Sequence, residues 1–203
     1  MDKWKVVVIL ALLAGLGGYG FYSSNAGNGL PTPLPTAPTP EPAPTPDPAS
    51  MLGKQLVTWD IADKLWMNTP KPVNVADLKG SISLVEFFRV NCSHCVEAAP
   101  FMEQIYKKYG KRGLKMVAIQ SPSKGDPDEN NWETVQGKVK TWGLTYPIAM
   151  DEGGKLFQEK YKLHTFPTMI VIDKSGTIRY FKSGHTPASA KALTDHLDSV
   201  LKP

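Results

Sequence analysis

A dense run of prolines limits which part of this chain can fold. Nine of its eighteen prolines lie between Pro31 and Pro48, where they alternate mainly with Thr, Ala, Glu and Asp. Proline has no backbone N–H and a fixed φ, so this run cannot form a helix or join a sheet and favours extended polyproline II. A hydrophobic core must therefore form from residues 51–203, roughly 150 residues, which suffice for one α/β domain.

Residues 1–26 predict a targeting segment. Two lysines precede an uncharged apolar run from Val6 to Tyr22, which is close to the ~20 residues of a membrane-spanning helix. Two interpretations stay open: an N-terminal apolar helix kept as a signal anchor, with the lysines in the cytoplasm, or a signal peptide cleaved near Ala26. Both place the domain in an extracytoplasmic compartment, either at the outer face of the cell membrane or, after cleavage, secreted.

Residues 27–50 predict a disordered Pro/Thr-rich linker between that segment and the domain. At about 3.1 Å per residue, the proline run would reach roughly 55 Å as polyproline II. A stiff spacer is useful when one of its ends is fixed to a membrane. We therefore favour the single-pass anchor over the cleaved signal peptide.

The composition narrows the class of function. The chain has two cysteines, Cys92 and Cys95, separated by two residues. A stabilising disulfide usually closes a longer loop, because a longer loop removes more conformational entropy from the unfolded chain. The net charge of +4 is spread over mixed acidic and basic residues, so the sequence gives no support to nucleic-acid binding. The pair thus favours redox exchange.

The hydrophobic pattern after residue 51 predicts alternating strands and helices. Strands are expected at residues 82–90, 114–120, 146–150, 168–173 and 177–182, with a short strand and turn at 72–80. Helices are expected at residues 93–109, 132–142 and 154–161, and a last helix has Thr186 as its N-cap, Pro187 in its first turn, and Ala190, Leu193, Leu197, Val200 and Leu201 on one face. This order predicts an α/β fold with a central mixed sheet flanked by helices.

The cysteine pair falls where the strand at 82–90 ends and a helix begins. A helix N-terminus offers free N–H groups and a positive dipole, which stabilise a thiolate. We expect Cys92 to be the exposed attacking sulfur and Cys95, one helical turn later, to be covered and to resolve the mixed disulfide. Ser93 and His94 lie between them and are expected to modulate the site, since a protonated His94 would stabilise the thiolate further. The pair would form a redox-active disulfide, and no other cofactor is expected.

Other uses of a cysteine pair have weaker support. A zinc site needs further ligands, and the remaining histidines, His164, His185 and His196, lack zinc-ligand spacing. We therefore expect no metal site. Covalent haem attachment needs a histidine directly after the second cysteine, where this chain has Val96. A non-catalytic metal or apoprotein chaperone that uses the same pair stays open as an alternative.

At the level of motifs, residues 65–203 resemble the TlpA-like extracytoplasmic branch of the thioredoxin superfamily. The resemblance rests on Phe87-Phe88 before the C-x-x-C pair, on Pro100 five residues after it, and on Phe166-Pro167-Thr168. Tyr146-Pro147 and the segments 151–154 and 171–176 follow the same spacing. The resemblance implies a thioredoxin-like fold with an inserted helix and strand. It also implies a cis-proline at Pro167, which together with Phe166 lines the substrate groove beside the cysteines.

Glu86 lies on the strand that is expected to be buried on both faces, where an unpaired carboxylate is costly. Burial should raise its pKa towards neutrality. The resemblance implies that a buried acid at this place, six residues before Cys92, accepts and returns the proton of the second cysteine.

The resemblance implies an enzyme that exchanges disulfides with cysteine-containing extracytoplasmic proteins, in the reducing direction, with a membrane redox partner. The family usually has Trp before the first cysteine, where this chain has Asn91, and members linked to cytochrome c maturation often have Glu three residues after the second cysteine, where this chain has Ala98. Both differences put a haem-apoprotein substrate in doubt. His94 is more similar to disulfide-forming oxidants. A disulfide-forming oxidant therefore stays open as an alternative.

Overall fold

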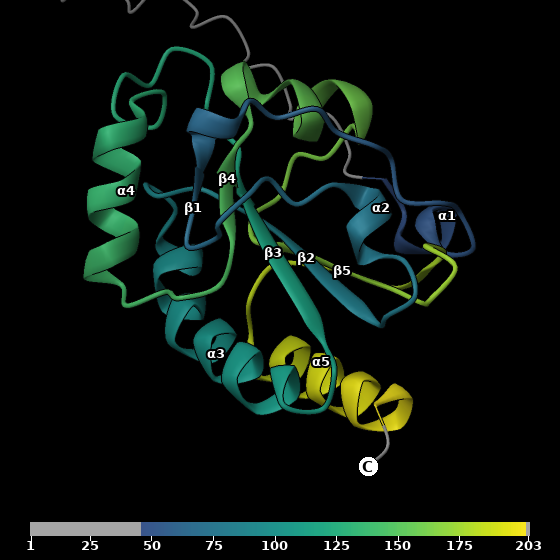
Figure 1. Ribbon diagram of the computed structural model, residues 1–203. Coiled ribbons are helices and arrows are strands. Elements are labelled where there is room, and N and C mark those ends of the chain that lie inside the picture. Colours follow the sequence, from purple (N-terminus) through teal and green to yellow (C-terminus); the bar gives the residue numbers. More distant parts are fainter. Residues whose placement is uncertain (1–45, 202–203) are drawn as a thin grey trace, which may run out of the picture. The chain divides into compact units, whose positions relative to one another are not determined.

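The computed structural model describes residues 46–201. Its centre is a six-stranded mixed sheet with the strand order β1-β4-β3-β2-β5-β6 (Figure 1). The strands are β1 (Trp66–Met67), β2 (Ser83–Phe88), β3 (Lys115–Gln120), β4 (Ile148–Met150), β5 (Thr168–Ile172) and β6 (Ile178–Ser183). β2, β3 and β4 are parallel, whereas β5, β6 and β1 run antiparallel to their neighbours. The predicted mixed sheet is confirmed.

The helical segments connect and cover this sheet. They are α1 (Pro48–Met51), the 3₁₀-helix η1 (Asp63–Leu65), α2 (Val75–Leu78), α3 (Ser93–Gly110), α4 (Trp132–Thr141), the 3₁₀-helix η2 (Glu152–Gly154), the π-helix η3 (Lys155–Lys160) and α5 (Pro187–Val200). α3 begins directly after the turn that leaves β2, and Pro100 lies within it. The expected helix at 154–161 is thus a 3₁₀ turn followed by a π-helix, because Gly153 and Gly154 both have positive φ and interrupt regular α-helix.

Two hydrophobic clusters fill the two faces of the sheet. Leu84 and Phe88 of β2 belong to the cluster that contains residues of α3, α4 and α5. Val85 and Phe87 belong to the opposite cluster, with residues of α2 and η3. Side chains alternate between the faces of a strand, so Glu86 of β2 points towards α3. This alternation sets the position of the carboxyl group in the site.

Several details differ from the sequence-based expectations. Residues 72–80 contain the short helix α2 instead of a strand, because the side chains of Asn74 and Asp77 form a capping box. Val200 is 38% exposed, so it does not share the buried face of α5 with Leu193 and Leu197. The two-residue strand β1 was not expected.

The N-terminal segment 1–26 and residues 27–45 of the expected linker lie outside the described residues. α1 begins at Pro48, within the last residues assigned to that linker. Across residues 46–201, every helix is too short or too polar to span a bilayer.

Candidate active site

The first cysteine is built into the start of α3. Cys92 is the N-cap residue, and its sulfur accepts a hydrogen bond from the N–H of Cys95 at 3.3 Å. Its carbonyl oxygen accepts from the N–H groups of Cys95 and Val96 at 3.0 and 3.1 Å. A thiolate at this position lies at the positive end of the helix dipole, with donors directed at it.

The two sulfurs have opposite environments. They are not bonded to each other in this structure. Cys92 is half-buried, and its pKa falls to about 6, mainly because the Cys95 thiol donates to its sulfur, with further help from N–H groups and the Arg89 charge. Cys95 is only 2% exposed, and burial, followed by that same hydrogen bond, raises the pKa of its thiol. At neutral pH, these environments favour the thiolate at Cys92 and the protonated thiol at Cys95.

The carboxyl group of Glu86 lies in the interior, on the α3 side of the sheet. Its residue is 3% exposed, and burial raises the pKa of Glu86 to about 7, which the hydrogen bond from Tyr146 partly opposes. The Tyr146 hydroxyl donates to Oε2 of Glu86 at 3.0 Å. The negative charge of Glu86 also acts on Cys95 and raises the pKa of that thiol. A carboxyl group that ionises near neutral pH can accept and return a proton during catalysis.

Replacing Tyr146 with phenylalanine is expected to raise the pKa of Glu86 further, by about one unit, because the hydrogen bond that favours the carboxylate is lost. The measurement is a ¹³C NMR titration of the Glu86 carboxyl carbon. Tyr106→Phe is the matched control, since Tyr106 packs edge-on against the Tyr146 ring and forms no bond to Glu86 among the described contacts. An unchanged or lower pKa in Tyr146→Phe would contradict the assignment.

The segment before β5 lies beside the end of β2. The Phe166–Pro167 peptide bond is cis, as expected. Phe87 of β2 is paired with Thr168 of the adjacent strand β5, so Pro167 lies at the end of the sheet from which the chain continues to Cys92. The Phe166 ring is half-buried and stacks on Phe157 with centroids 4.0 Å apart. Phe166 and Pro167, the two residues expected to line the substrate groove, therefore lie at the end of the sheet where β2 finishes and the cysteine turn begins.

The residues between the cysteines are exposed. Ser93 is the first residue of α3. The His94 ring is 63% exposed, and its Nδ1 lies 3.3 Å from a carboxylate oxygen of Glu97. The backbone N–H of His94 contributes to the low pKa of Cys92. The side chain of His94 is therefore directed along the helix towards Glu97.

Three polar residues of the site were not singled out from the sequence. Tyr146 donates a hydrogen bond to Glu86, and Arg89 favours the Cys92 thiolate. Glu129 accepts a hydrogen bond from the N–H of Asn91, in the turn before Cys92. In the sequence, Tyr146-Pro147 served only as part of a spacing motif. The signal that could have identified Arg89 is its charge at the end of an apolar strand. Glu129 lies in a polar loop, where the sequence does not distinguish it from a solvent-exposed residue.

Residues 46–201 contain no group of three or more His, Cys, Asp or Glu side chains placed to hold one metal ion. The polar groups close to the cysteines are instead the carboxyl of Glu86, the hydroxyl of Tyr146 and the guanidinium of Arg89. Arg89 lowers the pKa of Cys92, Glu86 raises the pKa of Cys95, and Tyr146 donates a hydrogen bond to Glu86.

Comparison with known proteins gives a family match over most of the chain. The Redoxin family model matches residues 52–197. The protein DipZ of Mycobacterium tuberculosis is 31% identical over 125 residues, which cover 59% of this chain and 17% of that protein. The thiol-disulfide oxidoreductase ResA of Bacillus anthracis is 32% identical over 108 residues, which cover 53% of this chain and 58% of that protein. The chain thus spans less than two thirds of the length of these curated relatives.

Other similarities extend over more of the chain. ResA of Halalkalibacterium halodurans is 24% identical over 207 aligned positions, which cover 100% of this chain and 99% of that protein. A putative thiol:disulfide interchange protein DsbE from Chlorobium tepidum superposes with a TM-score of 0.63 at 21% identity, covering 74% of this chain and 97% of that one. A thiol-disulfide isomerase from Corynebacterium glutamicum gives 0.62 at 22%, with 74% and 97% covered. The chain has the thioredoxin-like fold of these solved structures, and it belongs to the Redoxin family.

Proposed function

We propose that this chain reduces disulfides of cysteine-containing extracytoplasmic proteins through a mixed disulfide at Cys92. The observation that carries the proposal is the contrast between the two sulfurs. Cys92 is accessible and has a pKa of about 6, whereas Cys95 is buried and its pKa is raised. Such a pair separates attack from release, because only one sulfur is a thiolate when substrate arrives.

The proposed reaction has two exchange steps. The Cys92 thiolate attacks one sulfur of the substrate disulfide, forms a Cys92–substrate disulfide, and releases the other substrate sulfur as a thiolate. Cys95 then passes its proton to the Glu86 carboxylate and attacks the Cys92 sulfur. The second substrate thiolate leaves, so two electrons have moved from the dithiol to the substrate and the Cys92–Cys95 disulfide remains. Phe166 and Pro167 would line the groove that binds an extended substrate segment.

The setting of the enzyme is inferred from the N-terminal sequence. Residues 1–26 would anchor the chain in the membrane or direct its export, residues 27–50 would act as the spacer, and residues 51–203 would form the catalytic domain. The cycle requires that a membrane redox partner reduces the Cys92–Cys95 disulfide again. An exported domain with a redox-active pair is consistent with this arrangement.

The reducing direction is supported by the position of His94. A charged imidazole beside Cys92 would stabilise the thiolate and favour a strong oxidant. In this structure, the His94 ring lies against Glu97. His94 lowers the pKa of Cys92 through its backbone N–H and not through its side chain. The imidazole that favoured an oxidant in the sequence therefore has Glu97 as a contact and does not contribute to the low pKa of Cys92.

The reduction potential of the pair tests the direction. We expect a value near the −270 mV of thioredoxin, measured by equilibrating the full chain with dithiothreitol or glutathione buffers and trapping free thiols by alkylation; a value near −120 mV would make the protein an oxidant. Catalysed reduction of insulin would accompany the first result. Stoichiometric uptake of copper or zinc without insulin turnover would instead identify a metal chaperone and contradict the proposal.

A further inference from the structure

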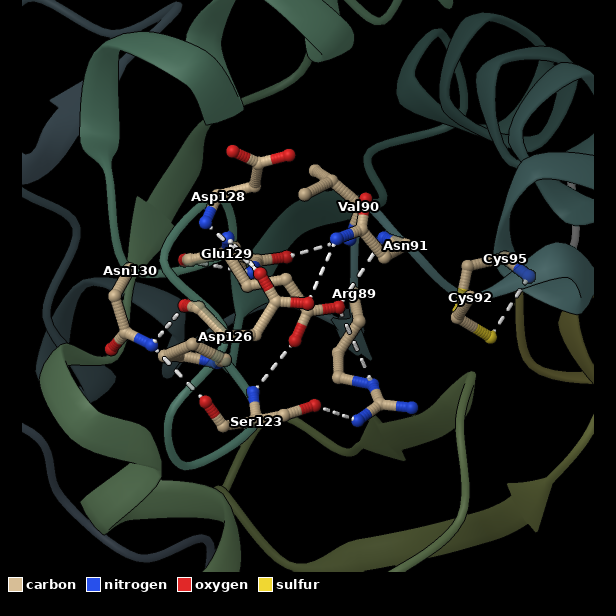
Figure 2. A network of polar contacts seen from close by, with 12 residues as sticks. Arg89, Val90, Asn91, Cys92, Cys95, Ser123, Asp126, Asp128, Glu129 and Asn130 are labelled. Carbon is tan, nitrogen blue, oxygen red and sulfur yellow. Dashed lines mark hydrogen bonds and ion pairs between the residues drawn. The ribbon is translucent and has the colours of Figure 1, made fainter. Parts of the chain in front are cut away.

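One buried carboxylate connects the loop of residues 121–131 to the turn before Cys92. Glu129 of this loop is 1% exposed. Its Oε2 accepts a hydrogen bond from the N–H of Ser123 at 2.7 Å, and its Oε1 accepts from the N–H of Asn91 at 3.3 Å. The same Oε1 lies 3.8 Å from Nε of Arg89 (Figure 2). A buried carboxylate is costly unless it is paired, so these contacts account for its position.

The Arg89 guanidinium is held from three sides. Besides facing Glu129, it donates a hydrogen bond to the hydroxyl of Ser123 and lies over the Phe166 ring, 4.9 Å from the ring centroid. Its charge lowers the pKa of Cys92. A long arginine side chain loses conformational freedom when it is fixed in this way, and the fixed position keeps its charge near the active-site turn.

The rest of the turn is attached to the same part of the molecule. The N–H of Val90 donates to the side-chain oxygen of Gln120 at 3.0 Å, at the end of β3. The Asn91 side chain donates to Asp126 at 2.9 Å and accepts from the ammonium of Lys138 on α4. Three consecutive residues before Cys92 therefore contact the segment from Gln120 to α4. Figure 2 shows Ser123, Asp126 and Glu129 of this segment on one side of the turn, with Cys92 and Cys95 on the other.

We propose that Glu129 is a positioning residue for disulfide exchange, which holds the Arg89 guanidinium in place and so maintains the positive environment of the Cys92 sulfur. The proposal rests on the proposed role of Cys92 as the attacking sulfur. Within residues 46–201, the titratable side chains that shift the pKa of Cys92 are those of Cys95 and Arg89, whereas His94 acts through its backbone N–H and its ring lies against Glu97. Glu129 would therefore act on Cys92 through Arg89.

The direction in which the Cys92 pKa changes when Glu129 is replaced distinguishes a positioning role from a direct effect of the Glu129 charge. A carboxylate near a thiol disfavours the thiolate, so if Glu129 were only a negative charge, removing it would lower the pKa of Cys92. If Glu129 acts by holding Arg89, its loss frees the guanidinium and raises the pKa of Cys92. Glu129→Gln distinguishes the two, because it removes the charge and keeps the shape of the side chain.

The pKa of Cys92 can be measured in the full chain, in its dithiol form, from the rate of iodoacetamide alkylation as a function of pH. In Glu129→Gln we expect a rise of about one unit, which corresponds to about a tenfold lower thiolate fraction at a pH below both values. The matched control is Asp128→Asn, which removes an exposed carboxylate from the same loop and is expected to leave the Cys92 pKa unchanged. An unchanged or lower pKa in Glu129→Gln would overturn the proposal.

A double-mutant comparison tests the route through Arg89. Arg89→Met alone is expected to raise the pKa of Cys92, and adding Glu129→Gln in that background should shift it by less than half as much as in the wild-type background. An undiminished second shift would overturn the route. Arg89→Met replaces a partly exposed side chain, so if Glu129→Gln does not fold, an unchanged Cys92 pKa in Arg89→Met still refutes the proposal. If Cys92 of the wild type is not alkylated at all, the proposed function itself fails.

Discussion

Replacing Cys92 with serine is expected to lower disulfide turnover by at least about a thousandfold, to the uncatalysed rate, because a hydroxyl at this position cannot replace a thiolate with a pKa of about 6. The buried Cys95 cannot take over, since its pKa is raised and only 2% of it is exposed. Insulin reduction in the presence of dithiothreitol measures the loss. Circular dichroism of the variant checks that the domain is folded.

Cys95→Ser is the matched variant and should behave differently. It retains the attacking sulfur and lacks the resolving one, so it should accumulate a covalent Cys92–substrate adduct that is visible on a non-reducing gel. Peptide mapping should locate the adduct at Cys92. Residual multiple turnover in Cys92→Ser, or a stable adduct at Cys95 in that variant, would mean that the roles of the two sulfurs are reversed.

Replacing Glu86 with glutamine is expected to remove a large pH dependence of stability. In the unfolded chain this group has its ordinary pKa of 4.5, and in the folded protein its pKa is raised to about 7. Between these values the folded chain keeps a proton that the unfolded chain has released. Its contribution to stability is therefore complete below pH 4.5 and is lost as the pH rises through 7. The difference corresponds to about 3 kcal/mol between pH 4 and pH 8.

Urea unfolding of the dithiol form at pH 4 and pH 8 measures this term. Relative to wild type, Glu86→Gln should become more stable by about 3 kcal/mol on going from pH 4 to pH 8. The depressed pKa of Cys92 acts in the opposite direction between about pH 6 and 9, and it cancels because both proteins contain Cys92. Glu133→Gln, which neutralises an exposed carboxylate on α4, should follow the wild-type pH dependence. Parallel curves for Glu86→Gln and wild type would show that the folded carboxyl ionises normally.

The parts of the site that were predictable from the sequence depend on local signals. The apolar run before the cysteines indicates the buried strand β2, and the cysteine pair with its helix-forming continuation indicates α3. Glu86 was identifiable because a carboxylate within an apolar strand is unusual. Its face of the sheet then follows from the alternation of side chains along β2.

The partners of these residues were not predictable, because they come from distant parts of the chain. Tyr146 is 60 residues from Glu86, and Glu129 is 38 residues from Asn91. Such pairs form only after the chain has folded, because Tyr146 precedes β4, which β3 separates from β2 in the sheet, and Glu129 lies in the 121–131 loop. By contrast, the capping box of Asn74 and Asp77 is a local signal, and it indicates a helix where a strand was expected.

The sulfur that caps α3 makes the stability of the helix dependent on redox state. In the dithiol form, the Cys92 thiolate accepts the Cys95 N–H and carries the negative charge that a helix N-terminus favours. When Cys92 forms a disulfide with a substrate or with Cys95, that charge disappears, and a capping interaction of about 1 kcal/mol is weakened. The negative charge at the N-cap therefore stabilises the first turn of α3 in the dithiol form and is absent in the disulfide form. In the proposed cycle, the negative charge at the N-cap of α3 would disappear and return with each turnover.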